Sequence, residues 1–340
     1  MRVILDGMGG DYAPEEIVKG AVEATGLIDE EICIVGLPDA IEKELRKNKY
    51  EGNQIKIIPA TETISMEDSP VKAIRRKTDS SLVVAMYMLK GDKNAVLISA
   101  GNTGALAVGA RMILGRITGM DRPALACIYP SMTGEEPALL CDAGASSESK
   151  AQNLLEYAIM GSIFMEKVWG ISKPTVGLVN LGVEESKGTS VTRDAYQMLK
   201  ASHLNFIGNI EARELPDRPC DVIVCDGFTG NVILKLTEGM AISVFNLVKG
   251  KLMQNIKTKM AAIIIKKELR ELKGMFDYEE YGGAPILGVN GPVIKIHGAS
   301  TSVGVKNAII RALPFAKENV VDIIQASLLE IEEIMEEEQE

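Results

Sequence analysis

One repeating pattern constrains the fold of this chain more than any other feature. Short runs rich in Val and Ile recur from end to end and are separated by segments with helical periodicity. The runs cover residues 3–5, 32–35, 55–58, 95–98, 139–141, 176–181, 222–224 and 293–296. Strands that are predominantly apolar, rather than alternating, are covered on both faces, as parallel strands between helices are. The pattern predicts an α/β fold with α/β/α layers and a mostly parallel sheet.

Five of these runs lead through a glycine-rich loop into a helix-like segment. The loops read "DGMGGDYAP", "SAGNTGALA", "CDAGASSES", "CDGFTGNVI" and "HGASTSVGV". In open α/β sheets, ligands bind outside the carboxyl ends of the strands, and the free N–H groups of a following helix attract anions. A tight turn would explain one such loop, but five favour a cradle for an anionic ligand.

Length and composition limit the class of protein. The 340 residues contain no linker rich in Pro, Gly or Ser, so we expect a single catalytic unit over residues 1–340, within which two lobes could form. A net charge of −10 argues against nucleic acid as a partner. The five cysteines form no C-x-x-C pair, no signal sequence precedes Arg2, and no uninterrupted apolar run approaches the ~20 residues of a membrane span. These features predict a soluble, cytoplasmic protein with reduced thiols.

Several common catalytic motifs are missing from the sequence. "GMGGDY" departs from G-x-G-x-x-G because Tyr12 occupies the third glycine position, and no P-loop motif occurs. With only His203 and His297, the chain offers no histidine-based metal cluster and little room for a Ser-His-Asp triad. We therefore expect no metal, and a nucleophile that is already ionised at neutral pH, such as inorganic phosphate.

Further motifs along nearly the whole chain carry a family resemblance. Besides the loops, they include "GRITGMDRPAL", "LEYAIMGS", "EESKGT", "NFIGNIEAR" and "YGGAP". With these motifs the chain resembles the bacterial phosphate acyltransferases (the PlsX family), which transfer a long-chain acyl group from acyl carrier protein to inorganic phosphate for phospholipid synthesis. The resemblance implies a fold related to isocitrate dehydrogenases and phosphotransacetylases, a homodimer, and no organic cofactor. Tyr12, Ser146 and Ala299 replace the His, Asn and Ser that are usual in the family.

Acyl transfer from a thioester to phosphate needs a place for phosphate and hydrogen-bond donors for the oxyanion. Backbone N–H groups of two glycine loops suit both tasks, and the hydroxyls of Thr103 and Thr229 could add donors. Helix capping by these threonines is the alternative. The predicted substrate-binding residues are Gly101, Asn102, Thr103, Gly104, Asp226, Gly227, Thr229 and Gly230.

Three side chains are candidates for catalysis. Lys187, in "EESKGT", could bind phosphate or the oxyanion, as the family match favours, or could be an ordinary surface lysine. Asn231 opens a helix-like segment, where it could cap the helix or donate its amide N–H to the substrate. His297 follows a strand and could satisfy a loop carbonyl or donate a proton.

One segment differs from the rest in charge. Residues 249–273 carry eight Lys or Arg against two Glu, so their net charge is 8 − 2 = +6. At about 100° per residue, one helix face would collect Leu252, Met253, Ile256, Met260, Ile263 and Ile264. Such a face edged with lysines suits an anionic membrane surface, a twin helix in a dimer, or the acidic carrier protein. We predict a helical excursion over residues 237–275 for membrane or dimer contact.

The sequence thus predicts a cytoplasmic acyl carrier protein:phosphate acyltransferase that associates peripherally with the inner face of the cell membrane. Two alternatives stay open. A phosphotransacetylase-like enzyme would take acyl coenzyme A instead. A membrane-surface scaffold built on an inactive enzyme fold would form no product.

Overall fold

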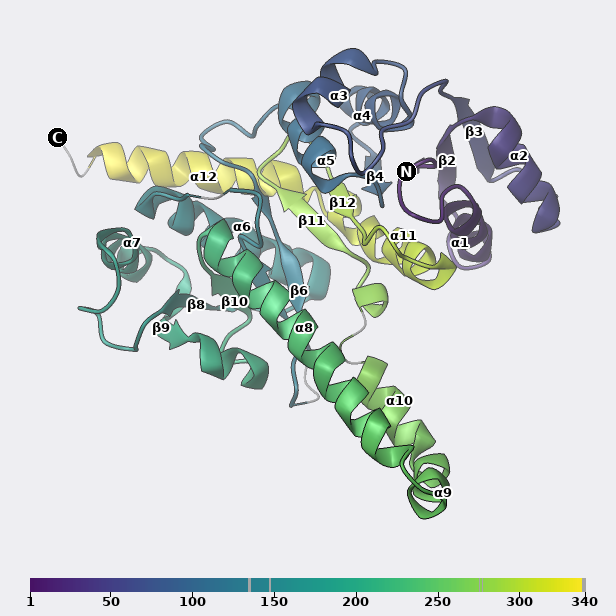
Figure 1. Cartoon of the computed structure of the whole chain (residues 1–340). Helices are drawn as coiled ribbons and strands as arrows, with labels where there is room; N and C mark the ends of the chain where they lie inside the picture. The colour runs from purple at the N-terminus through teal and green to yellow at the C-terminus, as the bar shows by residue number, and fades with distance from the viewer. Residues whose placement is uncertain (134–135, 147, 275, 277, 338–340) are drawn as a thin grey trace.

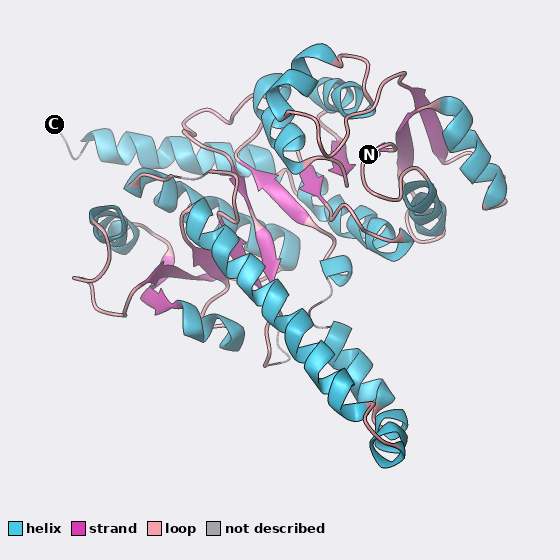
Figure 2. Ribbon diagram, viewed as in Figure 1, coloured by secondary structure: helices cyan, strands magenta, loops and turns pink. Residues whose placement is uncertain are grey.

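The computed structural model shows two α/β sheets that share a hydrophobic core (Figure 1). It describes residues 1–133, 136–146, 148–274, 276 and 278–337. One cluster of buried side chains contains residues from the central strands of both sheets and from the helices between them. Figure 2 shows the helices arranged around the strands of each sheet. The two sheets therefore pack as parts of one body.

The first sheet has seven strands in the order β3-β2-β1-β4-β12-β11-β5. All neighbours pair in parallel except β11, which is antiparallel to both β12 and β5. α1 (Glu15–Thr25) and α11 (Ser302–Lys317) cover one face, and α3 (Pro70–Arg76), α4 (Ser81–Gly91) and α5 (Thr103–Gly109) cover the other. The strands are β1 (Arg2–Asp6), β2 (Glu31–Gly36), β3 (Ile55–Pro59), β4 (Ala95–Ser99), β5 (Ala124–Leu125), β11 (Ala284–Leu287) and β12 (Val293–Lys295).

The second sheet has five strands in the order β6-β7-β10-β8-β9, with only β6 antiparallel. α6 (Ala151–Trp169) and α7 (Ser190–Ala201) pack in the shared core, where α12 (Val320–Glu337) lies against α6. α8 (Gly227–Leu252) packs on the opposite face. The strands are β6 (Cys127–Tyr129), β7 (Ala138–Cys141), β8 (Thr175–Asn180), β9 (Asn205–Glu211) and β10 (Val222–Val224). The remaining elements near the sheets are α2 (Pro38–Lys47), a π-helical turn (Ala110–Leu114) and two 3-10 turns (Ala212–Asp217 and Tyr278–Glu280).

All eight predicted strands are present, but four further strands were not predicted. The missed strands β5, β6, β9 and β11 lie at or next to sheet edges. In β9 polar residues interrupt the apolar ones, and only Asn209 and Ile210 are buried, so the strand has no continuous apolar run. β11 contains Pro285, a residue that argues against a strand when read from sequence alone.

A helical excursion leaves the body of the protein at α8 (Figure 1). α9 (Ile256–Ile264) forms its tip, and α10 (Lys266–Gly274) returns towards the body. The rings of Phe245 in α8 and Phe276 after α10 meet edge to face, 5.9 Å apart. Met275, the last residue of the predicted segment, lies outside the described residues. The excursion is therefore a hairpin of helices rather than one helix.

The single apolar face predicted from Leu252 to Ile264 is wrong, because the helix breaks inside it. α8 ends at Leu252, and Asn255 begins α9 by accepting the backbone N–H of Thr258 at 3.0 Å. Leu252 is half-buried on α8, whereas the other five side chains of the predicted face are exposed. On α9 alone, an exposed face remains at Ile256, Met260, Ile263 and Ile264.

Among the described residues, α8 is the only helix that could cross a membrane by length and composition. Only 11% of its most apolar window is buried. Lys235 and Glu238 interrupt the apolar sequence of α8, so this helix contains no long uninterrupted apolar run. Its first turns pack against the second sheet, so the helix is anchored in the fold at its start.

Candidate active site

The five glycine loops lie at the carboxyl ends of strands, as predicted, but they form two groups. Three follow β1, β4 and β12, which are neighbours in the first sheet. The other two follow β7 and β10, which are neighbours in the second sheet. The sequence could not show this division, since it depends on how the strands are ordered in space.

Beneath the first group of loops, Asp6 organises a buried polar layer. Its carboxylate accepts hydrogen bonds from the hydroxyls of Ser81 at 2.5 Å and Ser99 at 2.7 Å. Burial raises the pKa of Asp6, and the two serine hydrogen bonds oppose that rise. A Cβ on Gly9 would lie 2.5 Å from the carboxylate and 2.7 Å from the backbone nitrogen of Gly101. Only glycine permits this close approach of the two loops.

Lys295, the last residue of β12, lies beside this layer, and sequence reasoning missed it. Its Nζ donates to the carbonyl oxygens of Ala100, at 3.1 Å, and Ile296. Burial lowers the pKa of Lys295 to about 8. A lysine inside an apolar strand was the available signal, because lysine is rarely buried without a reason.

A cavity of about 330 Å³ opens at this edge of the first sheet. The strand ends and the segments that follow them supply the polar residues Asp11, Thr103, Lys295 and His297, and α8 supplies Lys235 and Glu238. The strands β5 and β6 and the helix α8 supply much of its apolar wall, including Leu125, Cys127, Ile128 and Leu234. A cation and a hydroxyl beside an apolar wall suit a small anion next to an acyl chain.

His297 is the one of the three predicted catalytic residues that lines this cavity. It is exposed, and its Nδ1 accepts the backbone N–H of Ala299 at 3.1 Å. This contact differs from the expected alternative, a hydrogen bond to a loop carbonyl. A neutral imidazole that accepts at Nδ1 carries its proton on Nε2. His297 can therefore donate a hydrogen bond from Nε2 into the cavity.

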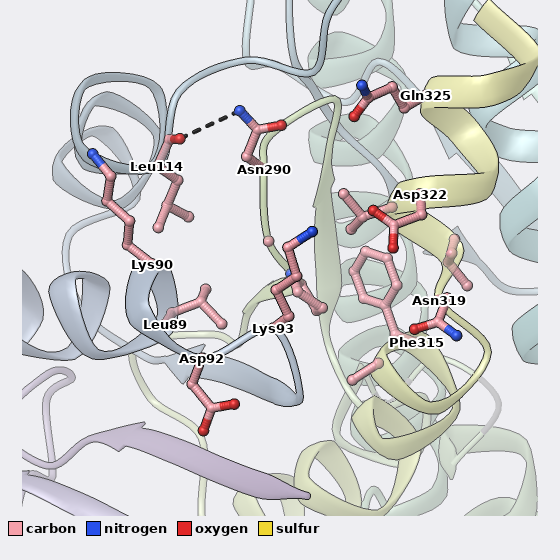
Figure 3. A pocket seen from close by; sticks show the side chains of 15 residues that line it. Leu89, Lys90, Asp92, Lys93, Leu114, Asn290, Phe315, Asn319, Asp322 and Gln325 are labelled. Atoms are coloured by element: carbon pink, nitrogen blue, oxygen red, sulfur yellow. Dashed lines mark hydrogen bonds between the residues drawn. The ribbon is translucent and has the colours of Figure 1, made fainter.

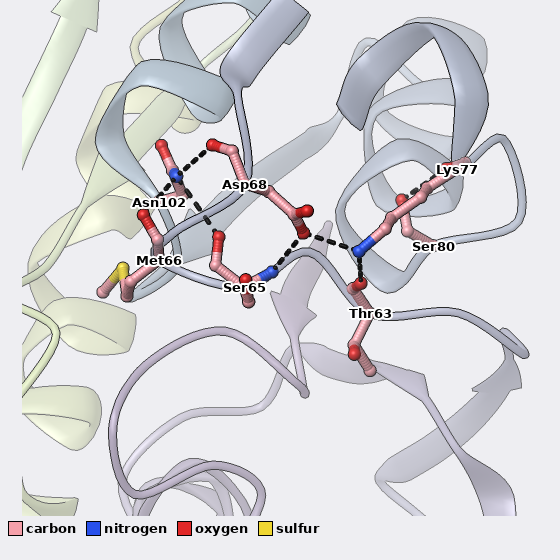
Figure 4. A network of polar contacts seen from close by, with 7 residues as sticks. All are labelled: Thr63, Ser65, Met66, Asp68, Lys77, Ser80 and Asn102. Carbon is pink, nitrogen blue, oxygen red and sulfur yellow. Dashed lines mark hydrogen bonds and ion pairs between the residues drawn. The ribbon is translucent and has the colours of Figure 1, made fainter. Parts of the chain in front are cut away.

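The predicted substrate-binding residues of the β4 loop are mostly used within the fold. Asn102 caps α5 by accepting the N–H of Ala105 at 3.0 Å, and its amide donates to the carbonyls of Ser65, Met66 and Asp68 (Figure 4). Asp68 in turn accepts hydrogen bonds from the N–H of Ser65 and from Lys77 (Figure 4). This network holds the loop that brings Met66 to the cavity.

The other members of that loop differ in what they can offer a ligand. Gly101 donates its N–H to Ser99 Oγ at 3.0 Å. A Cβ on Gly104 would lie 2.6 Å from Pro70 Cγ, so Gly104 allows close packing against α3. Thr103 is exposed and lines the cavity. Of residues 101–104, Thr103 is thus the one whose position fits ligand contact.

At the second edge, Asp142 holds its own loop together. Its carboxylate accepts the N–H groups of Leu125, Gly144 and Ala145 on Oδ1, and that of Ser146 on Oδ2, at 2.9–3.0 Å. Burial raises the pKa of Asp142, and these backbone hydrogen bonds oppose the rise. Sequence reasoning did not single out Asp142, although it follows the apolar run in "CDAGASSES".

The loop after β10 packs tightly on that of Asp142. A Cβ on Gly227 would lie 2.5 Å from Asp142 Oδ2, and one on Gly230 would overlap the carbonyl oxygen of Asp142. α8 begins at Gly227, four residues earlier than the helix expected at Asn231. Asp226 is its N-cap and accepts the N–H and the hydroxyl of Thr229, at 2.9 and 2.7 Å. Asp226 is therefore the helix cap, and Thr229 donates to that cap instead of being the cap itself.

Asn231 and Lys187 lie at the second edge, away from His297. Asn231 is exposed, and its Cβ would be 3.3 Å from a Cβ placed on Gly144. It precedes Leu234 and Lys235 of the cavity wall by one helical turn. Lys187 is exposed in the loop after β8, and its ammonium makes no hydrogen bond or ion pair with any residue that the structure describes. The three candidate residues do not form one cluster.

Two further kinds of chemistry find no support in the described part of the chain. No group of three or more His, Cys, Asp or Glu side chains there could hold a metal ion. All five cysteines are free and buried, and burial raises the pKa of Cys127 to about 12. A thiol that stays protonated at neutral pH is a poor nucleophile.

A second hollow, of about 270 Å³, lies near the amino-terminal end of β12 (Figure 3). Its lining includes Lys90, Lys93, Phe315 and Asp322, and Asn290 donates to the carbonyl of Leu114 at 3.4 Å. Because the glycine loops occupy the opposite ends of the strands, this hollow is separate from the candidate active site.

Solved structures with the same fold support the architecture. A phosphotransacetylase from Streptococcus pyogenes matches with a TM-score of 0.63 and 16% identity, covering 94% of each chain. The EutD phosphotransacetylase from Staphylococcus aureus matches with a TM-score of 0.58 and 14% identity, over 93% of this chain and 94% of that one. A 4-hydroxythreonine-4-phosphate dehydrogenase from Klebsiella pneumoniae matches with a TM-score of 0.54 and 12% identity, covering 93% of this chain and 99% of that one. The predicted fold class, that of phosphotransacetylases and related dehydrogenases, is confirmed.

Sequence relatives define the family more narrowly. Residues 1–323 match the family described as fatty acid synthesis protein. A phosphate acyltransferase of Alkaliphilus oremlandii (strain OhILAs) is 50% identical over 324 residues, 95% of this chain and 96% of the relative. A phosphate acyltransferase of Clostridium tetani (strain Massachusetts / E88) is 46% identical over 333 residues, 98% and 99% of the two chains. The chain belongs to this family of phosphate acyltransferases.

Proposed function

We propose that this protein transfers a long-chain acyl group from the thioester of acyl carrier protein to inorganic phosphate, and so makes acyl phosphate for glycerophospholipid synthesis. Membership of the phosphate acyltransferase family supports the transfer of an acyl group to phosphate. The single structural observation that carries the proposal is the cavity in which Lys295 and His297 lie beside an apolar wall.

The reaction places few demands on acid–base groups. A phosphate oxygen attacks the thioester carbon, a C–O bond forms, the C–S bond breaks, and the leaving thiolate takes up a proton. Thiols have a pKa of about 8.5, so the thiolate leaves readily. In the proposal, His297 donates a hydrogen bond from Nε2 to the leaving sulfur, which takes its proton from solvent, and the Asn231 amide donates to the oxyanion from the second edge. Lys187 remains a candidate phosphate ligand that would have to reach the phosphate from the same edge.

Product formation with two acyl donors separates the candidate functions. The protein is incubated with inorganic phosphate and either acyl carrier protein thioester or acyl coenzyme A, and acyl phosphate is trapped with hydroxylamine. A higher kcat/KM with the carrier protein is the expected result. Preference for coenzyme A would favour the phosphotransacetylase-like alternative, and no product with either donor would favour the inactive scaffold. No added metal or organic cofactor is expected to be necessary.

For the helical excursion we propose contact with the anionic inner face of the cell membrane. The exposed apolar face of α9 includes Ile256 and Ile263, which are 77% and 73% exposed. Lysines 257, 259, 266 and 267 lie on or beside α9. Apolar burial and charge attraction add at such a surface, and each basic residue contributes about 1 kcal/mol. The excursion thus supports peripheral membrane association.

Paired charge and apolar variants test this contact. Replacing Ile256 and Ile263 by Asp, or Lys257 and Lys259 by Glu, should release the protein from anionic vesicles. Added salt should release the wild type only in part, because screening weakens charge attraction but not apolar burial. Activity on soluble thioester should persist in both variants. If the apolar variant becomes monomeric while the charge variant still binds vesicles, α9 is a subunit contact instead.

A homodimer is also proposed, and α8 offers the apolar surface for it. An exposed row along this helix contains Phe228, Val232, Leu236, Met240, Val244 and Leu247. Contiguous exposed apolar surface of this kind is typical of protein or membrane contacts. Light scattering of Leu236→Asp and Met240→Asp variants should show monomers, and dimers in both would exclude α8 as the interface.

The lysines of the excursion have an alternative role. Loss of carrier-protein binding in the Lys257→Glu, Lys259→Glu variant would assign those lysines to docking of the acidic carrier.

A further inference from the structure

A lysine is buried where three central strands of the first sheet end. The neighbours β1, β4 and β12 end in Asp6, Ser99 and Lys295, and Lys295 pairs in register with Ser99. Only 8% of the surface of Lys295 is exposed. Removing an ammonium from water costs several kcal/mol, so this position requires a compensating interaction or a function.

The interactions of Lys295 within the fold are incomplete. Its ammonium has three protons, and two of them are donated to the carbonyl oxygens of Ala100 and Ile296. Within the described part of the chain, the third proton has no acceptor and no carboxylate forms an ion pair with Nζ. Both carboxylate oxygens of Asp6 are already bonded to serine hydroxyls. A buried, unpaired cation therefore remains.

This cation lines the cavity of the candidate active site. The other charged or titratable groups around it are Asp6 and Asp11 from β1 and its loop, His297 from the β12 loop, Cys127 from β6, Lys235 and Glu238 from α8, and Tyr281. Lys235 and Glu238 form an ion pair of 2.8 Å with each other. Among the described residues, the cavity therefore offers an anion the unpaired cation of Lys295, and the hydroxyl of Thr103 lines the same cavity.

We propose that Lys295 binds inorganic phosphate in this cavity. Its third proton and the hydroxyl of Thr103 donate to phosphate oxygens, and Asp11 accepts the hydroxyl of hydrogen phosphate. The proposal rests on the proposed acyl transfer, in which this phosphate forms the new C–O bond to the acyl carbon while the thiolate leaves. Because opposite charge favours the ammonium, bound phosphate would raise the pKa that burial lowers to about 8.

The proposal is tested with variants of two lysines, one at each edge. Lys295→Met removes the charge and keeps the length of the side chain, and Lys187→Met does the same at the exposed lysine of the second edge. The apparent KM for inorganic phosphate is measured at saturating acyl carrier protein thioester, and the KM for the thioester at saturating phosphate. We expect Lys295→Met to raise the phosphate KM at least tenfold and to leave the thioester KM within twofold. Loss of a lysine that only stabilises the fold would not raise the KM for phosphate while leaving the KM for the thioester unchanged.

The pH dependence of the same constants gives a second measurement, which needs no variant to fold. Above about pH 8 the wild-type phosphate KM should rise, by up to tenfold per pH unit, as Lys295 loses its charge. Lys295→Arg, which stays charged, should not show the rise, and Lys295→Met should not either. Loss of the rise in both variants assigns it to Lys295 rather than to another titratable group of the cavity, namely Asp6, Asp11, Cys127, Lys235, Glu238, Tyr281 or His297.

Several results would overturn the proposal. One is a wild-type phosphate KM that stays flat between about pH 7.5 and 9.5. Another is an unchanged phosphate KM in folded Lys295→Met, or a rise confined to Lys187→Met. In these cases acyl phosphate is still formed, so the proposed function stands. A wild-type protein that forms no acyl phosphate would overturn the function as well.

Discussion

Gly230 and Gly239 lie on the same helix, and replacing each by alanine should change stability in opposite directions. A Cβ on Gly230 would overlap the carbonyl oxygen of Asp142 and lie 3.0 Å from Cys225 Sγ. A Cβ on Gly239 would have no heavy atom within 4 Å. The same substitution thus meets backbone at one position and open space at the other.

The expected sizes follow from these surroundings. Alanine is favoured over glycine in a helix interior by about 1 kcal/mol, so Gly239→Ala should stabilise by that amount. At Gly230 the same gain is opposed by overpacking of about 1–3 kcal/mol. The overlap also displaces Asp142, whose four backbone hydrogen bonds are worth about 1 kcal/mol or more each. If about two of these four hydrogen bonds are lost, Gly230→Ala should destabilise by about 2–4 kcal/mol in total.

Thermal unfolding and activity measurements check this prediction. For 340 residues the unfolding entropy is about 0.7 kcal/mol/K, so Tm should rise by about 1 °C in Gly239→Ala and fall by about 3–6 °C in Gly230→Ala. The acyl phosphate rate should fall in Gly230→Ala only, because Asn231 and the Asp142 loop move together. Equal Tm values and full activity in both variants would refute the close approach of α8 to Asp142.

Other variants test separate parts of the site. Asn231→Ala should lower turnover about 10²-fold if its amide is an oxyanion donor, without unfolding the protein, and a wild-type rate would exclude that role. Asp142→Asn should lower the free energy of unfolding measured with urea by about 1–3 kcal/mol, since the new amide N–H₂ would face the N–H of Ser146. An unchanged midpoint would show that Asp142 is protonated in the native protein. Burial raises the pKa of Glu156 from 4.5 to about 7, so wild-type stability should fall by up to about 3 kcal/mol as pH rises from 4.5 to above 7. Glu156→Gln should remove that slope in urea titrations at pH 5 and pH 8, and a slope equal to the wild type would assign it to other groups.

The central strands and their loops were predictable because the sequence pattern of each follows directly from how it is buried. Both faces of β1, β4 and β10 are covered, so their residues are apolar without alternation. The loops that follow need glycine for close approach, as at Gly9 and Gly230, and this requirement is visible as composition. Single residues with a local signal were also open to prediction. Asp226 and Thr229, like Asn255 and Thr258, have the three-residue spacing of a helix cap.

The grouping of the loops was not predictable from the same evidence. The loop of β12 joins those of β1 and β4 because β12 pairs with β4 across almost 200 positions of sequence, which no local pattern reports. Lys295 and His297 therefore share a cavity, whereas Lys187 lies at the other edge. The role of Asn102 is hidden for a similar reason, since its partners lie more than 30 residues earlier in the chain.

The uninterrupted course of α8 has a mechanical consequence. Its 26 residues give a rod of about 39 Å, held at one end between the Asp142 loop and the cavity wall and carrying α9 at the other. A tilt of about 5° around the held end would displace the far end by about 3 Å. The same tilt would turn Leu234 and Lys235 against the cavity. Because α8 is continuous from the cavity wall to α9, a force on α9 that tilts α8 would also change the width of the cavity.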